Sequence, residues 1–312
     1  MARRWHGLTA GAGFAAALAT GACVLSAIPV DAQSTAGSPA AECVAKNPTG
    51  AATVGKFIFR TYSRDDGVCL RVTSGGKLVY SKILGGAEIA TLGQPDDEES
   101  NAPAIRNGTD ITGLGRPDMI VSTYSGGAHC CTTHYVFEME PQFRLLAELN
   151  DADDDEAHFE RGKDGTYSYI TGDWTFGYWP TCFACSPSEV VTLRFVNDAK
   201  GGAYHLALDK MQKPAPSTAE WNKELAAARK AVNAGDPNSI GTTMWQTVLD
   251  LVYTGHSDLA WKFVDALGPK AQQKPFPTLA DFCGVLKQSP YWNDLGPTLK
   301  DAPKACRYTK TE

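Results

Sequence analysis

Two short cysteine motifs hold the residue types best suited to chemistry. Cys130 and Cys131 follow His129 directly, and Cys182-Phe-Ala-Cys185 is a C-x-x-C motif. If the two segments meet in space, their thiols and the imidazole would form a soft site for copper or zinc, or an exchangeable dithiol. One interpretation is therefore a metal-handling or thiol-redox protein, with His129, Cys130 and Cys131 as soft-metal candidates.

The same cysteines also have a structural interpretation. The chain contains nine cysteines, and eight remain when Cys23 in the N-terminal apolar run is set aside. An even number suits disulfide pairing in an oxidising compartment. Proximity favours Cys43 with Cys69 and Cys283 with Cys306. The eight candidates for disulfides are Cys43, Cys69, Cys130, Cys131, Cys182, Cys185, Cys283 and Cys306.

An aromatic segment lies at residues 173–179, in the last quarter of the predicted β region. In the run Asp173-Trp-Thr-Phe-Gly-Tyr-Trp179, strand alternation would put Trp174, Phe176 and Tyr178 on one face. Rigid aromatic faces bind sugars or apolar groups at a small entropic cost, so this row is a candidate ligand platform. The other interpretation is that the three rings belong to the core, since large aromatics are usually buried.

Familiar catalytic templates are missing from the sequence. There is no GxSxG, no HExxH, no Walker loop and no GxGxxG motif that follows a strand and opens a helix. Adjacent Cys and His residues are not the spatial dyad that catalysis needs. We assign no catalytic residue, and the sequence leans away from an enzyme.

The N-terminus and the overall charge indicate the compartment and limit the partners. Residues 1–32 begin with Arg3 and Arg4, continue as an apolar run and end at Val-Asp-Ala32, the pattern of a signal peptide cleaved near Ala32. We expect a periplasmic or extracellular protein. The net charge of −6 provides no basic field for nucleic acid, and no later stretch approaches a transmembrane length. Thr20 stands where a lipoprotein signal usually has Leu, which disfavours lipidation of Cys23.

The mature chain is expected to have three parts. Residues 33–55 are small, polar and proline-containing, and predict a flexible leader. Residues 56–211 alternate β-branched and aromatic residues between turn signals, which predicts an antiparallel β-meander. Beyond the Pro-Ala-Pro linker, residues 217–312 show helical periodicity, starting with the capping box Ser217-x-x-Glu220. The expected fold class is α+β, mainly β, with propeller-like repeats before a C-terminal helical region.

An internal repeat is the most informative feature of the β region. The segment Asp110-Ile-Thr-Gly-Leu-Gly-Arg-Pro-Asp118 precedes an apolar strand, and residues 160–166 precede another about 50 positions later. Residues 68–93 would be a further, eroded unit. These segments resemble the FG-GAP and VCBS-type repeats of secreted and surface proteins, whose loop motif is D-x-[DN]-G-D-G-x-x-D before a strand. The resemblance implies blades of a β-propeller.

The resemblance also implies a calcium ion as a candidate cofactor of the repeat loop. In the family, loop positions one, three, five and nine bind it. Asp110, Thr112 and Asp118 would be the ligands, since Leu114 at position five has no oxygen to offer. Two carboxylates are few for an ion that prefers about 6–8 oxygen ligands. The other interpretation is that both aspartates hydrogen-bond the backbone of the turn, as Asp commonly does.

Together these features predict an exported, non-catalytic binding or scaffolding protein of the cell envelope with disulfide-stapled β-repeats. Its partner would be an envelope protein or a glycan. The metal-handling or thiol-redox protein built on Cys130, Cys131, Cys182 and Cys185 is the alternative. Helices carrying Trp221, Trp245, Trp261 and Trp292 are expected to cover the open edge of the β region.

Overall fold

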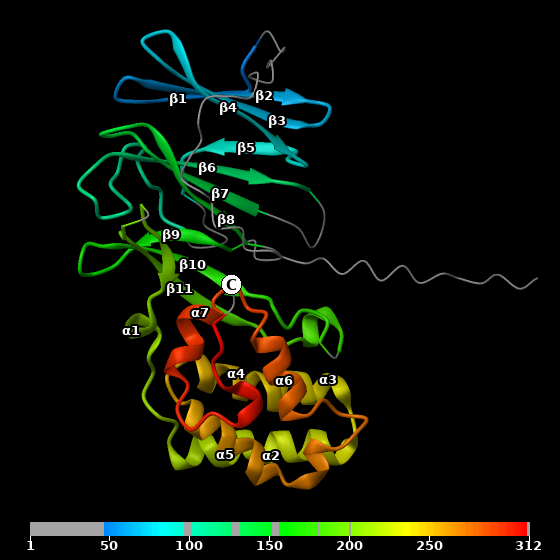
Figure 1. The fold of residues 1–312 in the computed structure, drawn as a ribbon. Helices are drawn as coiled ribbons and strands as arrows, with labels where there is room; N and C mark the ends of the chain where they lie inside the picture. The colour runs from blue at the N-terminus through cyan, green and yellow to red at the C-terminus, as the bar shows by residue number, and fades with distance from the viewer. Residues whose placement is uncertain are drawn as a thin grey trace, which may run out of the picture. The chain divides into compact units, whose positions relative to one another are not determined.

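Antiparallel strands come first in the described chain, and helices follow them (Figure 1). The computed structural model describes residues 47–96, 102–126, 132–151, 156–179, 181–199 and 201–310. The predicted signal peptide and most of the predicted leader lie outside these residues, as do His129, Cys130 and Cys131.

The strands form three four-stranded sheets, and each sheet joins its strands in chain order. All pairings are antiparallel, as tight turns between consecutive strands require. The first sheet contains β1 (Gly50–Val54), β2 (Phe57–Arg64), β3 (Gly67–Ser74) and β4 (Lys77–Gly85); the second contains β5 (Ile89–Leu92), β6 (Asp118–Tyr124), β7 (Thr132–Glu138) and β8 (Arg144–Asn150); the third contains β9 (His158–Arg161), β10 (Tyr167–Asp173), β11 (Glu189–Val196) and β12 (Ala203–Leu206).

The central strands of the second sheet, β6 and β7, are buried on both faces. Met119 and Val121 of β6 pack in one core with Phe59 and Leu70 of the first sheet. Ile120, between them in sequence, packs in another core with residues of the third sheet and the helices. Because successive side chains of a strand point to opposite faces, a strand covered on both sides carries consecutive apolar residues, as Met119-Ile120-Val121 of β6 shows.

Helices occupy the C-terminal part of the described chain. They are α1 (Leu208–Met211), α2 (Thr218–Ala234), α3 (Pro237–Ile240), the π-turn η2 (Gly241–Trp245), α4 (Gln246–Tyr253), α5 (Ser257–Leu267), α6 (Leu279–Leu286) and α7 (Trp292–Leu295), with short 3-10 turns η1 (Phe183–Cys185), η3 (Pro269–Gln272), η4 (Gly296–Thr298) and η5 (Lys304–Cys306). The predicted capping box is present, because Ser217 accepts from the Glu220 amide and Glu220 accepts from the Ser217 amide. Within the described residues, none of these helices has the length and apolar character needed to cross a membrane.

The structure therefore has the α+β class, with antiparallel sheets followed by helices. It corrects two boundaries. β1 lies inside the segment expected to be a flexible leader, and it pairs with β2. Its residues, Gly-Ala-Ala-Thr-Val, are mostly small and therefore do not show the alternation that predicts a strand. The first four-stranded sheet spans residues 50–85, whereas the expected eroded repeat spans residues 68–93. The predicted bounds of this unit were therefore wrong.

The helices and the third sheet share one core. Phe176, which follows β10, is fully buried and stacks on Phe282 of α6 with ring centroids 4.8 Å apart. Trp245 is also fully buried and stacks on the same ring at 5.1 Å. Of the four tryptophans expected to cover the β region, Trp245, Trp261 and Trp292 are buried.

This shared core leads to a truncation test. Deleting residues 217–312 should leave a β fragment that aggregates or self-associates, because the apolar surface around Phe176 loses its cover. Size-exclusion chromatography of the fragment beside the full-length chain measures this. A soluble, monomeric fragment would show that the sheets do not need the helices.

Candidate functional site

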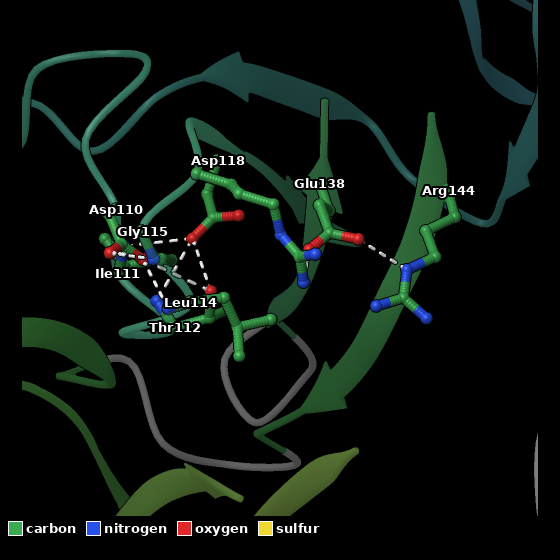
Figure 2. A network of polar contacts seen from close by, with 9 residues as sticks. Asp110, Ile111, Thr112, Leu114, Gly115, Asp118, Glu138 and Arg144 are labelled. Carbon is green, nitrogen blue, oxygen red and sulfur yellow. Dashed lines mark hydrogen bonds and ion pairs between the residues drawn. The ribbon is translucent and has the colours of Figure 1, made fainter. Parts of the chain in front are cut away.

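The turn before β6 is built around the buried carboxylate of Asp118 (Figure 2). Its Oδ2 atom accepts hydrogen bonds from the Ile111 amide at 2.9 Å, the Thr112 amide at 3.0 Å and the Thr112 hydroxyl at 2.9 Å. Asp118 is 2% exposed. One oxygen atom of Asp118 therefore fixes the path of the turn.

Asp110 organises the other half of the same turn. Its Oδ1 accepts from the Leu114 amide at 3.0 Å, and its Oδ2 accepts from the Gly115 amide at 2.7 Å. Gly115 has a φ of 73°, a left-handed conformation that favours glycine. The sequence thus supplies both the acceptor and the residue that lets the backbone donors turn toward it.

The second oxygen of Asp118 faces a different environment. Oδ1 is buried and has no hydrogen-bond partner among the described atoms. A cavity of about 10 Å³ adjoins Asp118 and is lined also by Asn107, Thr109 and Ile111, about the space that one water molecule occupies. Burial raises the pKa of Asp118 to about 6, despite the hydrogen bonds that favour its charged form.

A second buried carboxylate lies directly across the strand pair. Glu138 of β7 is opposite Asp118 of β6 and is fully buried. Arg116 and Arg144 both contact it, the latter through Nε at 2.6 Å from Oε2 (Figure 2). Two guanidinium groups compensate the buried negative charge, as a buried carboxylate requires.

The predicted calcium ligands lie in one turn, but three of the four carboxylate oxygens of Asp110 and Asp118 accept hydrogen bonds from groups of that turn. Both oxygens of Asp110 and Oδ2 of Asp118 accept from N–H or O–H groups. A calcium ion needs several oxygen lone pairs directed at one point. This arrangement matches the other interpretation, in which the aspartates hold the turn backbone. The described residues hold no group of three or more His, Cys, Asp or Glu side chains placed to bind a metal.

In the repeated loop of the third sheet, a lysine lies among the oxygens. Lys210 of α1 donates to Thr166 Oγ1 at 3.1 Å and to Ser168 Oγ at 3.0 Å, and its Nζ lies 3.6 Å from Asp164 Oδ2. The ammonium group of Lys210 thus donates hydrogen bonds to the two hydroxyl oxygens and lies beside the carboxylate of Asp164. No local sequence pattern indicates a role for Lys210, because it lies more than 40 positions from the residues it contacts.

A further polar network lies where the second and third sheets meet. The hydroxyl of Ser122 lies 2.7 Å from His134 Nδ1, and His134 Nε2 lies 3.1 Å from Asp151 Oδ2. Tyr169 donates to Asp151 Oδ1 from the third sheet. His134 and Asp151 are 6% and 2% exposed. No local sequence pattern predicts this network, because its members come from β6, β7, β10 and the residue that follows β8.

The order serine, histidine, aspartate is that of a nucleophile, a base and an orienting acid. Here the imidazole is enclosed by aromatic rings, with Tyr169 at 5.4 Å and Phe159 at 6.0 Å between centroids. His134 Nε2 and Asp151 Oδ2 lie 3.1 Å apart but do not form a well-aligned hydrogen bond. The geometry supports a structural role, in which the network satisfies polar groups between two apolar sheets.

The described cysteines are cross-linked. Cys182 pairs with Cys185. Cys283 pairs with Cys306, as their proximity in the sequence predicts. Cys69 is also disulfide-bonded. Cys43, Cys130 and Cys131 lie outside the described residues. The C-x-x-C motif is therefore a closed disulfide in this structure.

The aromatic segment is not a strand, which corrects the predicted platform. β10 ends at Asp173, whose Oδ1 accepts from the Thr175 amide at 2.9 Å and starts a turn. Phe176 is buried in the core, while Tyr178 is 65% exposed. Trp174 instead stacks on Phe183, with centroids 4.9 Å apart and planes within 11°.

Comparison with family models, curated proteins and solved structures finds no match.

We predict that Asp118 makes the stability of the protein pH-dependent. Its pKa is raised in the folded state, so the stability it contributes is fully present below about pH 4 and is lost as the pH rises through about 6. The raised pKa corresponds to about 3 kcal/mol. Glu189, whose pKa burial raises to about 7, contributes to a decline over the same range. Asp118→Asn should therefore reduce, but not abolish, the decline in urea unfolding measured between pH 4.5 and 7.5.

Asp164→Asn is the matched control. Hydrogen bonds from Thr166 hold the pKa of Asp164 below its usual value, so its effect has the opposite sign and lies at lower pH. The decline should survive in that variant. If the decline is as large in Asp118→Asn as in the unmodified chain, the protonation of Asp118 does not contribute to it.

The buried histidine network gives a second prediction. Asp151→Ala should destabilise the fold by about 1–3 kcal/mol, because it leaves the hydroxyl of Tyr169 buried without its acceptor and removes the carboxylate beside His134. Asp209→Ala removes the exposed ion pair with Arg194 and should cost less than about 1 kcal/mol. Urea unfolding at pH 7 compares the two, and equal effects would refute the structural role of the network.

Proposed function

We propose that this chain is an exported, non-catalytic binding or scaffolding protein of the cell envelope. The observation that carries the proposal is a set of three aromatic rings beside β10, Trp174, Tyr178 and Phe183, which we name the aromatic surface. Phe183 contacts both other rings, at 4.9 Å from Trp174 and 5.3 Å from Tyr178 between centroids.

The aromatic surface is held rigidly. Tyr178 has a φ of 61°, which is uncommon for a bulky residue, and its amide donates to Ser186 Oγ at 2.8 Å. Ser186 in turn donates to the Cys182 carbonyl at 2.9 Å. Strained backbone that its surroundings hold in place is typical of ligand-binding positions. An exposed ring on a fixed backbone loses less entropy when a ligand stacks on it than one on a mobile backbone.

The ligand we propose is a glycan, with an envelope protein as the other partner class. Sugar rings offer apolar C–H faces that stack on aromatic faces, and aromatic residues with a polar atom suit surfaces that are half apolar and half wet. The aromatic surface differs from the predicted row, because the half-buried Phe183 takes the place of the fully buried Phe176 beside Trp174 and Tyr178.

We propose that the sheets are FG-GAP-like blades of an open, propeller-like stack. Support comes from three four-stranded meanders in succession, with apolar cores shared by the first and second and by the second and third. Three units are fewer than the roughly four to eight blades of a closed propeller. The helices that share the core of the third sheet provide the remaining cover.

The structure supports disulfide staples over a four-thiol metal site. Cys182 and Cys185 are joined to each other, and a sulfur in a disulfide is not a thiolate ligand. Counting thiols in denatured, exported protein and analysing its metal content distinguishes the two. Few free thiols and no bound metal support staples, whereas several free thiols with bound copper or zinc support the alternative.

Glycan binding is tested by tryptophan fluorescence. Titrating the full-length chain with soluble peptidoglycan fragments should quench or shift the emission, and Tyr178→Ala should weaken binding about tenfold, as loss of a central stacking ring does. Tyr124→Ala, which removes a 39% exposed tyrosine on the second sheet, is the control. No response in the unmodified chain, or equal losses in both variants, would refute the aromatic surface as a glycan site.

A further inference from the structure

The disulfides with both cysteines described differ sharply in exposure. Cys283 and Cys306 are both fully buried. Cys182 is exposed and Cys185 is half-buried. Exchange begins when a thiolate attacks a disulfide sulfur, so access to that sulfur limits the reaction. We propose that Cys182–Cys185 is an exchangeable disulfide that oxidises a dithiol of a partner protein, with Cys182 as the attacked residue.

The turn around this disulfide does not depend on the sulfur–sulfur bond. The cysteines are three positions apart, against 23 for Cys283 and Cys306, so the bond closes a short loop and restricts the unfolded chain less. The Cys185 amide donates to the Cys182 carbonyl at 3.0 Å, and the Ser186 hydroxyl donates to the same oxygen at 2.9 Å. The bond can therefore open and close while the turn keeps its conformation.

The two cysteines are anchored unequally. The carbonyl oxygen of Cys185 lies so close to Gly241, the first residue of the π-turn η2, that a Cβ there would be 2.5 Å from it. No L residue with a side chain fits this contact without a shift. Cys185 is thus held against the helical region, and Cys182 is the sulfur-bearing residue presented to solvent. This asymmetry assigns Cys182 to the mixed disulfide and Cys185 to the leaving group.

The aromatic surface adjoins the reactive cysteine. Phe183 lies between the two cysteines in sequence, and its ring contacts Trp174 and Tyr178. A partner segment that carries cysteines could pack on these rings, which would bring its sulfur to Cys182. The exchange proposal does not rest on glycan binding, because it needs only an exposed sulfur and a neighbouring apolar face.

The chemistry balances without a further co-reactant. A thiolate of the partner attacks Cys182 Sγ, forms a new S–S bond and breaks the bond to Cys185, which leaves as a thiolate. The second thiolate of the partner then attacks the partner sulfur and releases Cys182 as a thiolate. Two electrons pass from the partner dithiol to the Cys182–Cys185 pair, and the two thiol protons of the partner end on these cysteines. The partner leaves as a disulfide.

The test uses the full-length chain in buffers with graded ratios of reduced to oxidised glutathione. After an acid quench, alkylation and mass spectrometry report each disulfide separately. Cys182–Cys185 should pass from disulfide to dithiol within this series while Cys283–Cys306 stays oxidised, which makes the buried pair an internal control. Equal resistance of both disulfides would overturn the proposal.

Two single variants test the direction of attack. In Cys185→Ser the remaining Cys182 thiol should form a mixed disulfide with oxidised glutathione at least tenfold faster than the Cys185 thiol of Cys182→Ser. Circular dichroism verifies that both variants are folded, since the hydrogen bonds of the turn survive either change. Equal rates, or faster reaction of Cys185, would show that exposure of Cys182 does not direct exchange. Neither measurement involves a glycan, so failure here and failure of the glycan site are separate results.

Discussion

The constraint that organises the described structure is the burial of the central strands of the second sheet, β6 and β7, on both faces. Apolar residues of β6 alternate between two cores, one shared with the first sheet and one with the third sheet and the helices. A polar group in such a sheet loses water on either side and must find a partner within the protein. The networks around Asp118, Glu138 and His134 meet this requirement. Each places hydrogen-bond donors, arginine side chains or an imidazole beside a carboxylate that would otherwise be buried without a partner.

This constraint explains which features could be predicted from sequence. The apolar run of β6, the capping box at Ser217 and the pairing of Cys283 with Cys306 depend on residues close in the chain, and their signals are local. Strand β1 was missed because its small residues carry almost no alternation. Lys210 was missed because its oxygen partners lie 42 and 44 positions away. The Ser122, His134 and Asp151 network was missed for the same reason, since register and sheet packing bring its members together.

The aromatic segment shows how one local contact overrides a pattern. Alternation of Trp174, Phe176 and Tyr178 predicts a continued strand, but Asp173 accepts from the Thr175 amide and closes a turn. The turn sends Phe176 into the core and leaves Tyr178 exposed, so the residues expected to share a face separate. An aspartate at a strand end commonly competes for backbone donors in this way. The candidate binding surface thus exists because the predicted strand ends early.

Asp173 also links that surface to the helices. Its Oδ2 accepts from the Ser289 hydroxyl at 2.7 Å and from Tyr253 of α4. Glu189 lies opposite Asp173 across β10 and β11, and burial, with the nearby charge of Asp250, raises the pKa of Glu189 to about 7. Near neutral pH a proton on Glu189 therefore lets two buried carboxyl groups face each other without full charge repulsion. The base of the turn that carries Trp174 and Tyr178 is fixed by donors from the helical region, so the position of the aromatic surface depends on the helices as much as on the sheet.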